Sequence, residues 1–171
     1  MRCCCVLRLI LPLCLVTYVE AIDCSDVTTS KPNELAQFLK AQAREADSEC
    51  VSQMISRLGE FRRASNANVL IDLLDFQRPE SAREKASLFD MHDKFPAVPA
   101  LFSIGLPAVP ALLSKLQSGE ENEVFRSNGI RALVTIYRDN FPEAIATLMK
   151  AAAAAKTETE AVRLESCAKD G

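Results

Sequence analysis

Two nearly identical octapeptides decide the fold: Pro96-Ala97-Val98-Pro99-Ala100-Leu101-Phe102-Ser103 and, 11 residues further on, Pro107-Ala108-Val109-Pro110-Ala111-Leu112-Leu113-Ser114. They match at seven of eight positions, and each carries two prolines three residues apart. A helix tolerates such prolines only in its first turn. Gly105 lies between the copies, where glycine favours the end of a helix. The stretch therefore predicts a short helix, a glycine stop and a second helix that folds back as a hairpin.

Further helices are predicted on the N-terminal side of the octapeptides. Pro32 fits the first turn of one helix, a second opens near Ser48 and ends at Gly59, and Ser65 or Asn66 caps a third that runs to residue 76. Apolar residues recur at helical intervals in all three: Leu35, Phe38 and Leu39, then Val51, Met54, Ile55 and Leu58, then Val69, Leu70, Leu73 and Leu74.

Three more helices are predicted on the C-terminal side. An acidic run after Gly119 starts a helix over 122–138, because negative charge at a helix N-terminus is favoured by the helix dipole. Asn140 with Pro142 starts a helix over 142–155, and Thr157 opens the last one. Their apolar stripes recur in the same way: Ile130, Leu133, Val134 and Tyr137, then Ile145, Leu148, Met149 and Ala152, then Ala161, Leu164 and Ala168.

The composition agrees with a folded helical protein. The 171 residues are 49% hydrophobic and 25% charged, which excludes a wholly disordered chain or a collagen-like fibre. The net charge of -3 argues against nucleic acid or anionic lipid as a partner held by charge. The sequence predicts an all-α fold, because no apolar residues up to the octapeptides alternate with the period of a strand.

The first 21 residues predict a secretory signal peptide. Arg2 and Arg8 supply its positive region, a short apolar stretch follows, and Val19 and Ala21 suit the peptidase. A membrane anchor is the alternative, but the apolar run is shorter than the roughly 20 residues of a span. A lipoprotein cut before Cys24 is disfavoured by the residues before it. We expect a signal peptide over 1–21, a polar leader over 22–31, a folded domain over 32–171, and a secreted, periplasmic or extracellular protein without a membrane span after cleavage.

Cleavage would leave three cysteines, Cys24, Cys50 and Cys167. An odd number permits at most one internal disulfide, and an oxidising compartment favours one. We predict a Cys24–Cys50 disulfide, because these two are the nearest pair along the chain. The alternative is three buried thiols that pack as small apolar side chains.

The junction Leu101-Phe102-Ser103-Ile104-Gly105-Leu106-Pro107-Ala108-Val109-Pro110-Ala111-Leu112-Leu113 resembles that of a HEAT repeat, in which one helix ends at glycine and its partner starts at proline. A weaker likeness joins Met54-Ile55-Ser56-Arg57-Leu58-Gly59 to Val69-Leu70-Ile71-Asp72-Leu73-Leu74. First helices starting near 48, 95, 121 and 157 have a mean spacing of about 36 residues, as in helical repeat proteins. The resemblance, over residues 48–168, implies an α-α superhelix of about three to four stacked antiparallel helix pairs. Residues 77–94 depart from it and form either an extra helix or an irregular loop.

Few residues point to chemistry. Asp90-Met91-His92-Asp93 holds the single histidine, but neighbouring residues of a helix point in different directions, so we interpret the cluster as a solvated polar patch and not as a metal or acid–base site. Phosphate-binding, dinucleotide and zinc-protease motifs are absent from the sequence, and we predict no cofactor and no metal. Arg126, Arg131 and Arg138 lie near one side of the 122–138 helix, where they form either a grip for an acidic partner or a solvated face.

By analogy with HEAT proteins, the resemblance implies a binding role. We predict a scaffold or interaction module whose partner is another protein, with no enzymatic activity. The alternative is an enzyme or lyase-like subunit with a pocket on the solenoid, which needs converging ionisable groups. The second helices of successive pairs, 66–76, 107–117 and 142–155, are expected to line up along one side of the stack. Their outward residues form the predicted partner-binding face: Asn68, Asp72, Asp75, Ser114, Lys115, Glu143 and Thr147.

Overall fold

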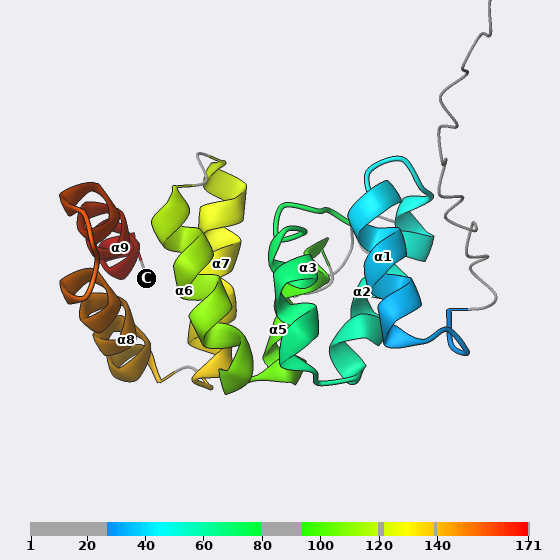
Figure 1. Ribbon diagram of the computed structural model, residues 1–171, viewed down its shortest axis with the longest axis horizontal. Coiled ribbons are helices and arrows are strands. Elements are labelled where there is room, and N and C mark those ends of the chain that lie inside the picture. Colours follow the sequence, from blue (N-terminus) through cyan, green and yellow to red (C-terminus); the bar gives the residue numbers. More distant parts are fainter. Residues whose placement is uncertain (1–26, 80–93, 120–121, 139, 171) are drawn as a thin grey trace, which may run out of the picture.

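The structure, a computed structural model (Figure 1), describes four ranges of the chain: 27–79, 94–119, 122–138 and 140–170. Within these ranges the regular elements are eight α-helices and two short 3-10 helices, and no strand is formed. The prediction of an all-α protein is thereby confirmed for this part of the chain. Four predicted features lie wholly or mostly outside the described residues: the signal peptide over 1–21, Cys24, the extra helix or loop over 77–94, and the cluster Asp90-Met91-His92-Asp93.

Helices α1 (Pro32–Gln42) and α2 (Ser48–Glu60) begin where the sequence predicts. Pro32 occupies the first turn of α1, where its missing N–H is not needed. The Asp47 carboxylate accepts a hydrogen bond from the Cys50 N–H at 3.0 Å and so caps α2. Local signals in the sequence thus fix both helix starts.

The third helical segment differs from its prediction. It consists of η2 (Ala64–Asn66) and α3 (Ala67–Ile71), so it is shorter than the predicted helix over 66–76. Asn66 does not cap α3 with its side chain. Its buried Nδ2 group instead donates to the Leu58 carbonyl at 3.2 Å, which ties the start of α3 to the end of α2. The chain continues after α3 in turns whose backbone hydrogen bonds span three residues.

The two octapeptides form α5 (Ala97–Ile104), then η4 (Leu106–Ala108) and α6 (Val109–Ser118). Gly105 separates them with φ at 77°, a backbone angle that glycine adopts without steric cost. The predicted helix, glycine stop and second helix are therefore present. However, the direction of the chain changes by 109° between the two helices, short of the full reversal of an antiparallel hairpin.

The C-terminal helices are α7 (Glu123–Ile136), α8 (Phe141–Ala153) and α9 (Glu158–Asp170). Asn122 caps α7, because its side-chain oxygen accepts from two N–H groups of the first turn at 3.0 and 3.3 Å. Thr157 Oγ1 accepts from the N–H three residues further on at 3.2 Å, as predicted for a helix start. All three predicted helices are present, with bounds shifted by one to a few residues.

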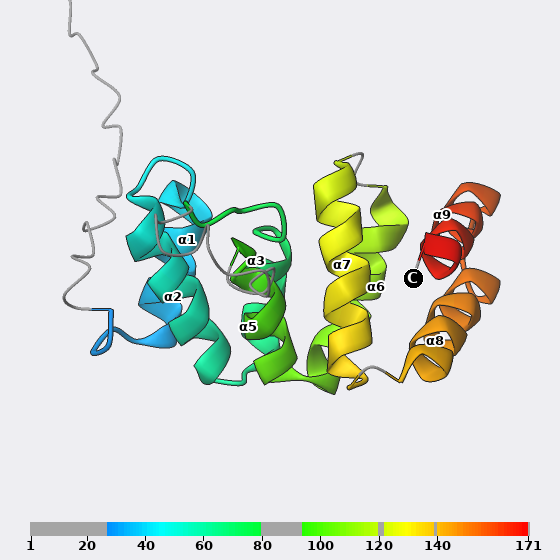
Figure 2. The same cartoon turned by 180° about the vertical axis from the view of Figure 1, so that it is seen from behind.

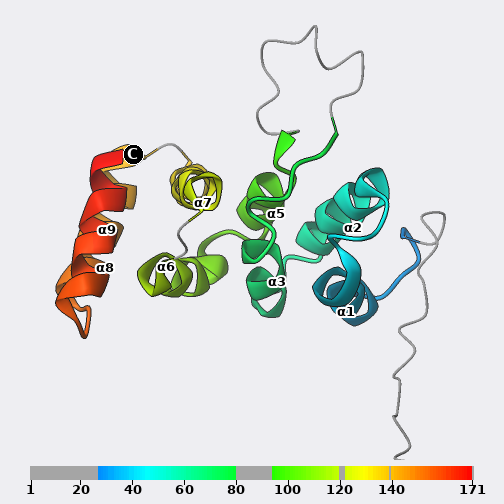
Figure 3. The ribbon, with the colours of Figure 1, turned by 90° about the horizontal axis from the view of Figure 1, so that it is seen from above.

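The helices pack in two layers. One layer contains α2, α5 and α7, and the other contains α1, α3 and α6 (Figure 3). Helices α8 and α9 pack on each other and lie across the end of the stack, as the view from above shows (Figure 3). Because α6 packs against α9, the predicted line of second helices continues only from α3 to α6, and α8 lies apart from it.

The core between the layers is apolar and tightly packed. Leu133 of α7 is fully buried, as its place in the predicted stripe requires. Helices α2 and α5 approach each other closely at Gly59, where an added Cβ would lie 2.6 Å from the Ala100 Cα. This contact requires a residue without a side chain at position 59 and a small residue at position 100.

Helices α2, α5 and α7 run in the same direction. Their C-terminal ends, and the turns into α3, η4 and α8, therefore lie along one edge of the molecule, the lower edge in Figures 1 and 2. The turn into α2, the C-terminal end of α6 and the N-terminal end of α7 lie along the opposite edge. The fold thus brings three turns that are distant in sequence next to one another.

Candidate functional site

The structure gathers only part of the predicted partner-binding face. Asp72, Asp75 and Lys115 come together with Arg44 in the turn after α1 and Asn122 at the start of α7. The contacts are Lys115 Nζ to Asp72 Oδ1 at 2.9 Å, Arg44 Nη2 to Asp75 Oδ1 at 2.8 Å, and Asn122 Nδ2 to Asp75 Oδ2 at 3.1 Å. We call these five residues the ion-paired face. Asn68 of α3 and Ser114 of α6 are exposed.

The charges of the ion-paired face hold helices together. The side chain of Asp75 is only 18% exposed, and it contacts residues from the turn after α1 and from the start of α7. The Lys115–Asp72 pair links α6 to the turn after α3 and is more exposed, so it contributes at most about 1 kcal/mol. A partner that binds these carboxylates would have to replace contacts that the chain already makes.

Glu143 and Thr147 lie elsewhere, at the turn between α7 and α8. Asn140 Nδ2 donates to the Glu143 carboxylate at 2.9 Å, and Thr147 Oγ1 lies 3.0 Å from the Tyr137 hydroxyl. These contacts join the last turn of α7 to the first turns of α8. The predicted face is therefore divided between two regions of the molecule.

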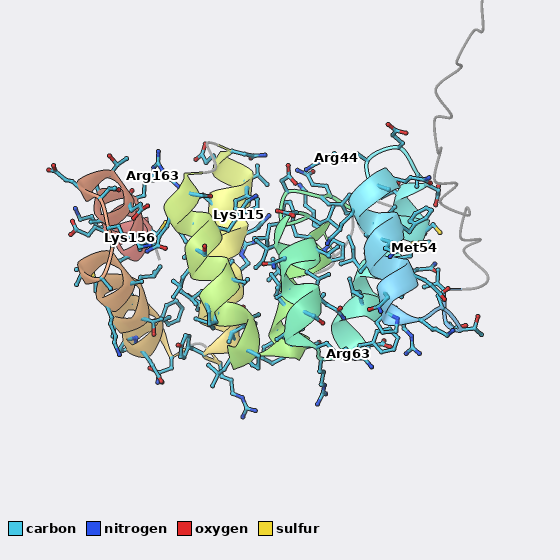
Figure 4. The ribbon with its side chains drawn as sticks, in the orientation of Figure 1. Arg44, Met54, Arg63, Lys115, Lys156 and Arg163 are labelled. Carbon is cyan, nitrogen blue, oxygen red and sulfur yellow. The ribbon has the colours of Figure 1, made fainter. Side chains whose placement is uncertain are left out.

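A second surface lies on the edge where α2, α5 and α7 end. Its residues lie in the three turns described above or in the helix ends that flank them, and we call it the turn edge: Arg62, Arg63, Phe102, Leu106, Arg138 and Phe141. The three apolar side chains are exposed to unusual degrees for their size, 44% for Phe102, 60% for Leu106 and 46% for Phe141. Figure 4 shows Arg63 at this edge and Arg44 of the ion-paired face near the opposite one.

Two arginines of the turn edge occupy an unusual backbone conformation. Arg62 follows α2 with φ at 51°, and Arg138 follows α7 with φ at 56°. This left-handed position after a helix is ordinarily glycine, because a Cβ is disfavoured there. Each arginine also follows an aromatic residue, Phe61 or Tyr137, that ends its helix. The same local arrangement thus occurs twice on one edge.

Charged residues of both signs occur around the turn edge. Among the described residues, no ion pair or side-chain hydrogen bond involves Arg62, Arg63 or Arg138. Acidic residues lie close to these arginines in sequence. Glu60 pairs with Arg57 at 2.6 Å, and Glu143 accepts from the neutral amide of Asn140 and keeps its charge. Asp139, which directly follows Arg138, lies outside the described residues. The edge therefore combines three exposed guanidinium groups with three exposed apolar side chains.

Sequence reasoning identified only part of this surface. Arg138 was grouped with Arg126 and Arg131 on one side of the 122–138 helix. In the structure, Arg131 donates to Asn128 at 3.4 Å and Arg126 has its own contact, whereas Arg138 lies beyond the helix end. An aromatic residue followed by arginine occurs at residues 61–62 and again at residues 137–138. This repeat predicts the turn edge once it is known that α2 and α7 end at these positions.

A cleft of about 420 Å³ lies between α6, α7 and α9. Its lining includes Glu123, Arg126, Arg163 and the buried thiol of Cys167. Arg163 Nη1 donates to the Gln117 carbonyl at 3.2 Å, near the C-terminal end of α6, where a cation is favoured. Arg163 therefore serves the packing of α9 on α6. Within the described ranges, no three His, Cys, Asp or Glu side chains are arranged to hold a metal ion.

No single helix in the described part of the chain is long and apolar enough to cross a membrane. Helix α5 and the segment Leu106–Ser118 would be long and apolar enough only when taken together, and they meet at a bend of 109°. Comparisons of the chain with protein-family models, with curated protein sequences and with solved structures find no match in any of the three. The side chains on the surface of the chain are therefore the basis for a proposed function.

Proposed function

We propose that the chain is an exported helical-repeat module that binds another protein and catalyses no reaction itself. The packing of α1 to α7 in two layers supports a HEAT-like arrangement, in which successive helix pairs stack side by side. In this proposal α8 and α9 close the end of the stack. Cleavage after Ala21 would deliver the module to a secreted or periplasmic compartment.

The observation that carries this proposal is the turn edge. Aromatic residues and arginine are enriched at protein interfaces and in their energetically dominant positions. Phe102 and Phe141 are both nearly half exposed, and arginines accompany them in the neighbouring turns. Since these side chains project from the ends of packed helices, a partner would find them already ordered and would lose less entropy on binding.

The ion-paired face is the less favourable surface for a partner. Asp72 and Asp75 already contact Lys115, Arg44 and Asn122 within the chain. A partner would have to break these contacts before it gains its own, so the net free energy of binding there is smaller.

Site-specific photo-crosslinking in the full exported chain tests the proposal. A photoreactive phenylalanine analogue replaces Phe102 in one variant and Phe141 in another. The matched control places it at Met149 of α8, which is 46% exposed, like Phe141. We expect both turn-edge variants, and not the control, to crosslink to the same partner protein.

Two results would contradict the proposal. The first is crosslinking at position 149 alone, which would place binding elsewhere. The second is a chain that crosslinks to no protein and that instead converts a substrate. In that case Cys167→Ala should abolish the reaction. That second result would favour the enzyme-like alternative, with the cleft beside Cys167 as its site.

A further inference from the structure

We propose that the exported chain is cut by a protease that recognises paired basic residues, and that the bond cut is Arg63–Ala64. The inference goes beyond the proposed function, but it rests on the export step of that function, because the protease acts on the chain along its route out of the cell. It follows from the sequence of one turn, from the exposure and backbone of that turn, and from the contacts between the helices on either side of it.

The turn between α2 and η2 contains the single pair of adjacent basic residues in the sequence. The chain has 20 lysines and arginines, and only Arg62 and Arg63 are neighbours. A protease selects its substrate by the side chains that precede the cut bond, and an acidic pocket selects a basic residue there. Two neighbouring arginines fill two such pockets. A protease with two acidic pockets therefore has one preferred site in this chain.

The paired arginines are accessible to a protease. Residues 62–65 are exposed one after another, whereas the helices on both sides include buried residues. Figure 4 shows Arg63 at the turn edge. Among the described residues, neither Arg62 nor Arg63 takes part in an ion pair. Exposed turns with small or polar residues are the preferred sites of proteolytic cleavage, and Ala64 and Ser65 follow the two arginines.

The backbone of the turn is close to the conformation that a protease binds. Peptides that add to a protein edge do so as extended strands, and Arg63 is already extended, with φ at -96° and ψ at 127°. Arg62 is left-handed, with φ at 51°, which is disfavoured for a residue with a Cβ. Extension of the chain at Arg62 therefore releases backbone strain.

Few hydrogen bonds hold the turn closed. The Arg62 N–H donates to the Gly59 carbonyl at 2.9 Å, and the Asn66 N–H donates to the Arg63 carbonyl at 3.0 Å. Opening of the turn breaks these two backbone bonds, while the apolar side chains of α2 stay buried. A protease therefore reaches the bond after Arg63 by a local opening and not by unfolding of the chain.

Other basic residues between the helices lack one of these features. Lys31 and Arg78 each precede a proline, whose ring replaces the amide hydrogen on the far side of the bond. Arg44, Arg138 and Lys156 are single basic residues, so each fills only one of two acidic pockets. Lys156 is exposed in the turn between α8 and α9, which makes it the matched control site.

The two pieces of the cut chain stay together. The first piece contains α1 and α2, and the second begins with η2. Across the two pieces, the Arg78 guanidinium donates to both carboxylate oxygens of Glu49 at 2.9 and 3.2 Å. Helix α2 also packs along α5, with Gly59 directly against Ala100. These contacts do not depend on the continuity of the turn.

Hydrolysis alters the turn edge. The oxygen of a water molecule bonds to the Arg63 carbonyl carbon, the amide bond breaks, and the Ala64 nitrogen leaves as an amine that takes up a proton. The products are a carboxylate on Arg63 and an ammonium group on Ala64. Arg62 and Arg63 then form a free chain end, so the cut changes one of the three turns of the edge while the helices remain packed.

Incubation of the full exported chain with a subtilisin-like protease specific for paired basic residues tests the inference. Mass spectrometry of the products identifies the bond that is cut first. We expect one piece to end at Arg63 and the other to begin at Ala64. On a reducing denaturing gel the two pieces should separate, whereas size-exclusion chromatography without denaturant should show a single species.

Three variants separate recognition of this turn from general susceptibility. Arg63→Gln should slow cleavage at least about 100-fold, because an acidic pocket of the protease is left unpaired. Ala64→Pro keeps both arginines and should also block the cut, and proline is tolerated at the start of a helix after an extended residue. Lys156→Gln removes the same charge elsewhere and should leave the rate within about twofold. Equal circular dichroism spectra verify that the variants are folded.

Three outcomes with the purified chain would overturn the inference: resistance to the protease, first cleavage at another bond, and equal rates for Arg63→Gln and Lys156→Gln. N-terminal sequencing of the chain recovered after export should find a terminus at Ala64, and its absence would also overturn the inference. If photo-crosslinking captures a partner but the bond stays intact, only the proposed cleavage is wrong. If the bond is cut but no partner is crosslinked, the proposed function fails instead.

Discussion

Replacing Gly59 by alanine should destabilise the fold, although alanine is the better helix former. Gly59 lies in the last turn of α2, and an ideal Cβ at this position would lie 2.6 Å from the Ala100 Cα and 2.9 Å from its carbonyl oxygen. Carbon atoms in contact are normally about 3.5–4.0 Å apart. Because the obstructing atoms belong to the backbone of α5, no side-chain rotation relieves the clash. The two helices have to separate by about 1 Å.

The size of the effect follows from two opposing contributions. Alanine is more favourable than glycine in a helix interior by up to about 1 kcal/mol, and by less near a helix end. Overpacking of a dense core costs about 1–3 kcal/mol, and a gap of about 1 Å along α2 and α5 weakens contacts of neighbouring residues as well. We expect Gly59→Ala to lower the free energy of unfolding by about 1–2 kcal/mol, which lowers Tm by about 2–8 °C in a chain of this size.

Gly129→Ala is the matched control, since Gly129 is also a buried glycine of a helix, α7. A Cβ there would meet the ends of flexible side chains, Leu116 Cδ2 at 3.0 Å and Leu112 Cδ1 at 3.7 Å. These methyl groups can move by a few tenths of an ångström. We therefore expect Gly129→Ala to leave stability unchanged or to raise it by up to about 1 kcal/mol.

Urea unfolding of the full chain, followed by far-UV circular dichroism, measures both variants. The m-values should be unchanged, so that the shift in midpoint reports stability. The close approach of α2 and α5 is refuted if Gly59→Ala is as stable as the original chain while Gly129→Ala behaves as expected. A loss of equal size in both variants would also refute it, because the local contacts differ.

Leu133→Asp should unfold the region around α7, because Leu133 is fully buried and an unpartnered carboxylate costs several kcal/mol there; retained helical content in a thermal melt would contradict this. Asn128→Ala should cost about 1–3 kcal/mol, since Asn128 is buried and its Nδ2 donates to a backbone carbonyl after α3 at 2.8 Å; urea unfolding measures the loss, and an unchanged midpoint would exclude the role. A Cys24–Cys50 disulfide should add about 3 kcal/mol by closing a loop of about 25 residues, and peptide mapping without reduction should find the linked peptides, whereas alkylation of every thiol would exclude it. N-terminal sequencing of the exported chain should show cleavage after Ala21, and a retained first residue would disprove it.

The interior of the molecule shows why local signals did not predict every helix correctly. The prolines of the octapeptides and the cap of α2 at Asp47 act within one helical turn, so the sequence alone predicted the helices that they start. Asn66, one of the two residues predicted to cap α3, instead donates to Leu58 at the end of α2. A cap would use the side-chain oxygen as acceptor, whereas the bond to Leu58 uses Nδ2 as donor, and the packing of the α3 start against the α2 end turns the side chain toward Leu58.

The candidate site was predictable only in its residue types. Charges on the predicted face, such as Asp72 and Asp75, were recognised as polar and exterior from their helical positions. Their pairing with Lys115 and Arg44 joins residues 31 to 43 positions apart, and helical periodicity contains no information on such pairs. For the same reason the sequence grouped Arg138 with residues of its own helix, whereas the fold places its turn on an edge with that of Arg62.

The sequence by itself determined that this chain is helical, because apolar spacing, proline at helix starts and glycine after α5 act over a few residues. Only the tertiary structure decided that α2, α5 and α7 end on one edge and that α8 and α9 lie across the stack (Figure 3). Those features depend on how closely two helices approach, as α2 and α5 do at Gly59 and Ala100. They also depend on the direction that the chain takes in the turn between two helices. Contacts between segments that are distant in sequence determine the distance between helices and the direction of each turn. The pattern of residues along a single segment therefore does not predict either of them.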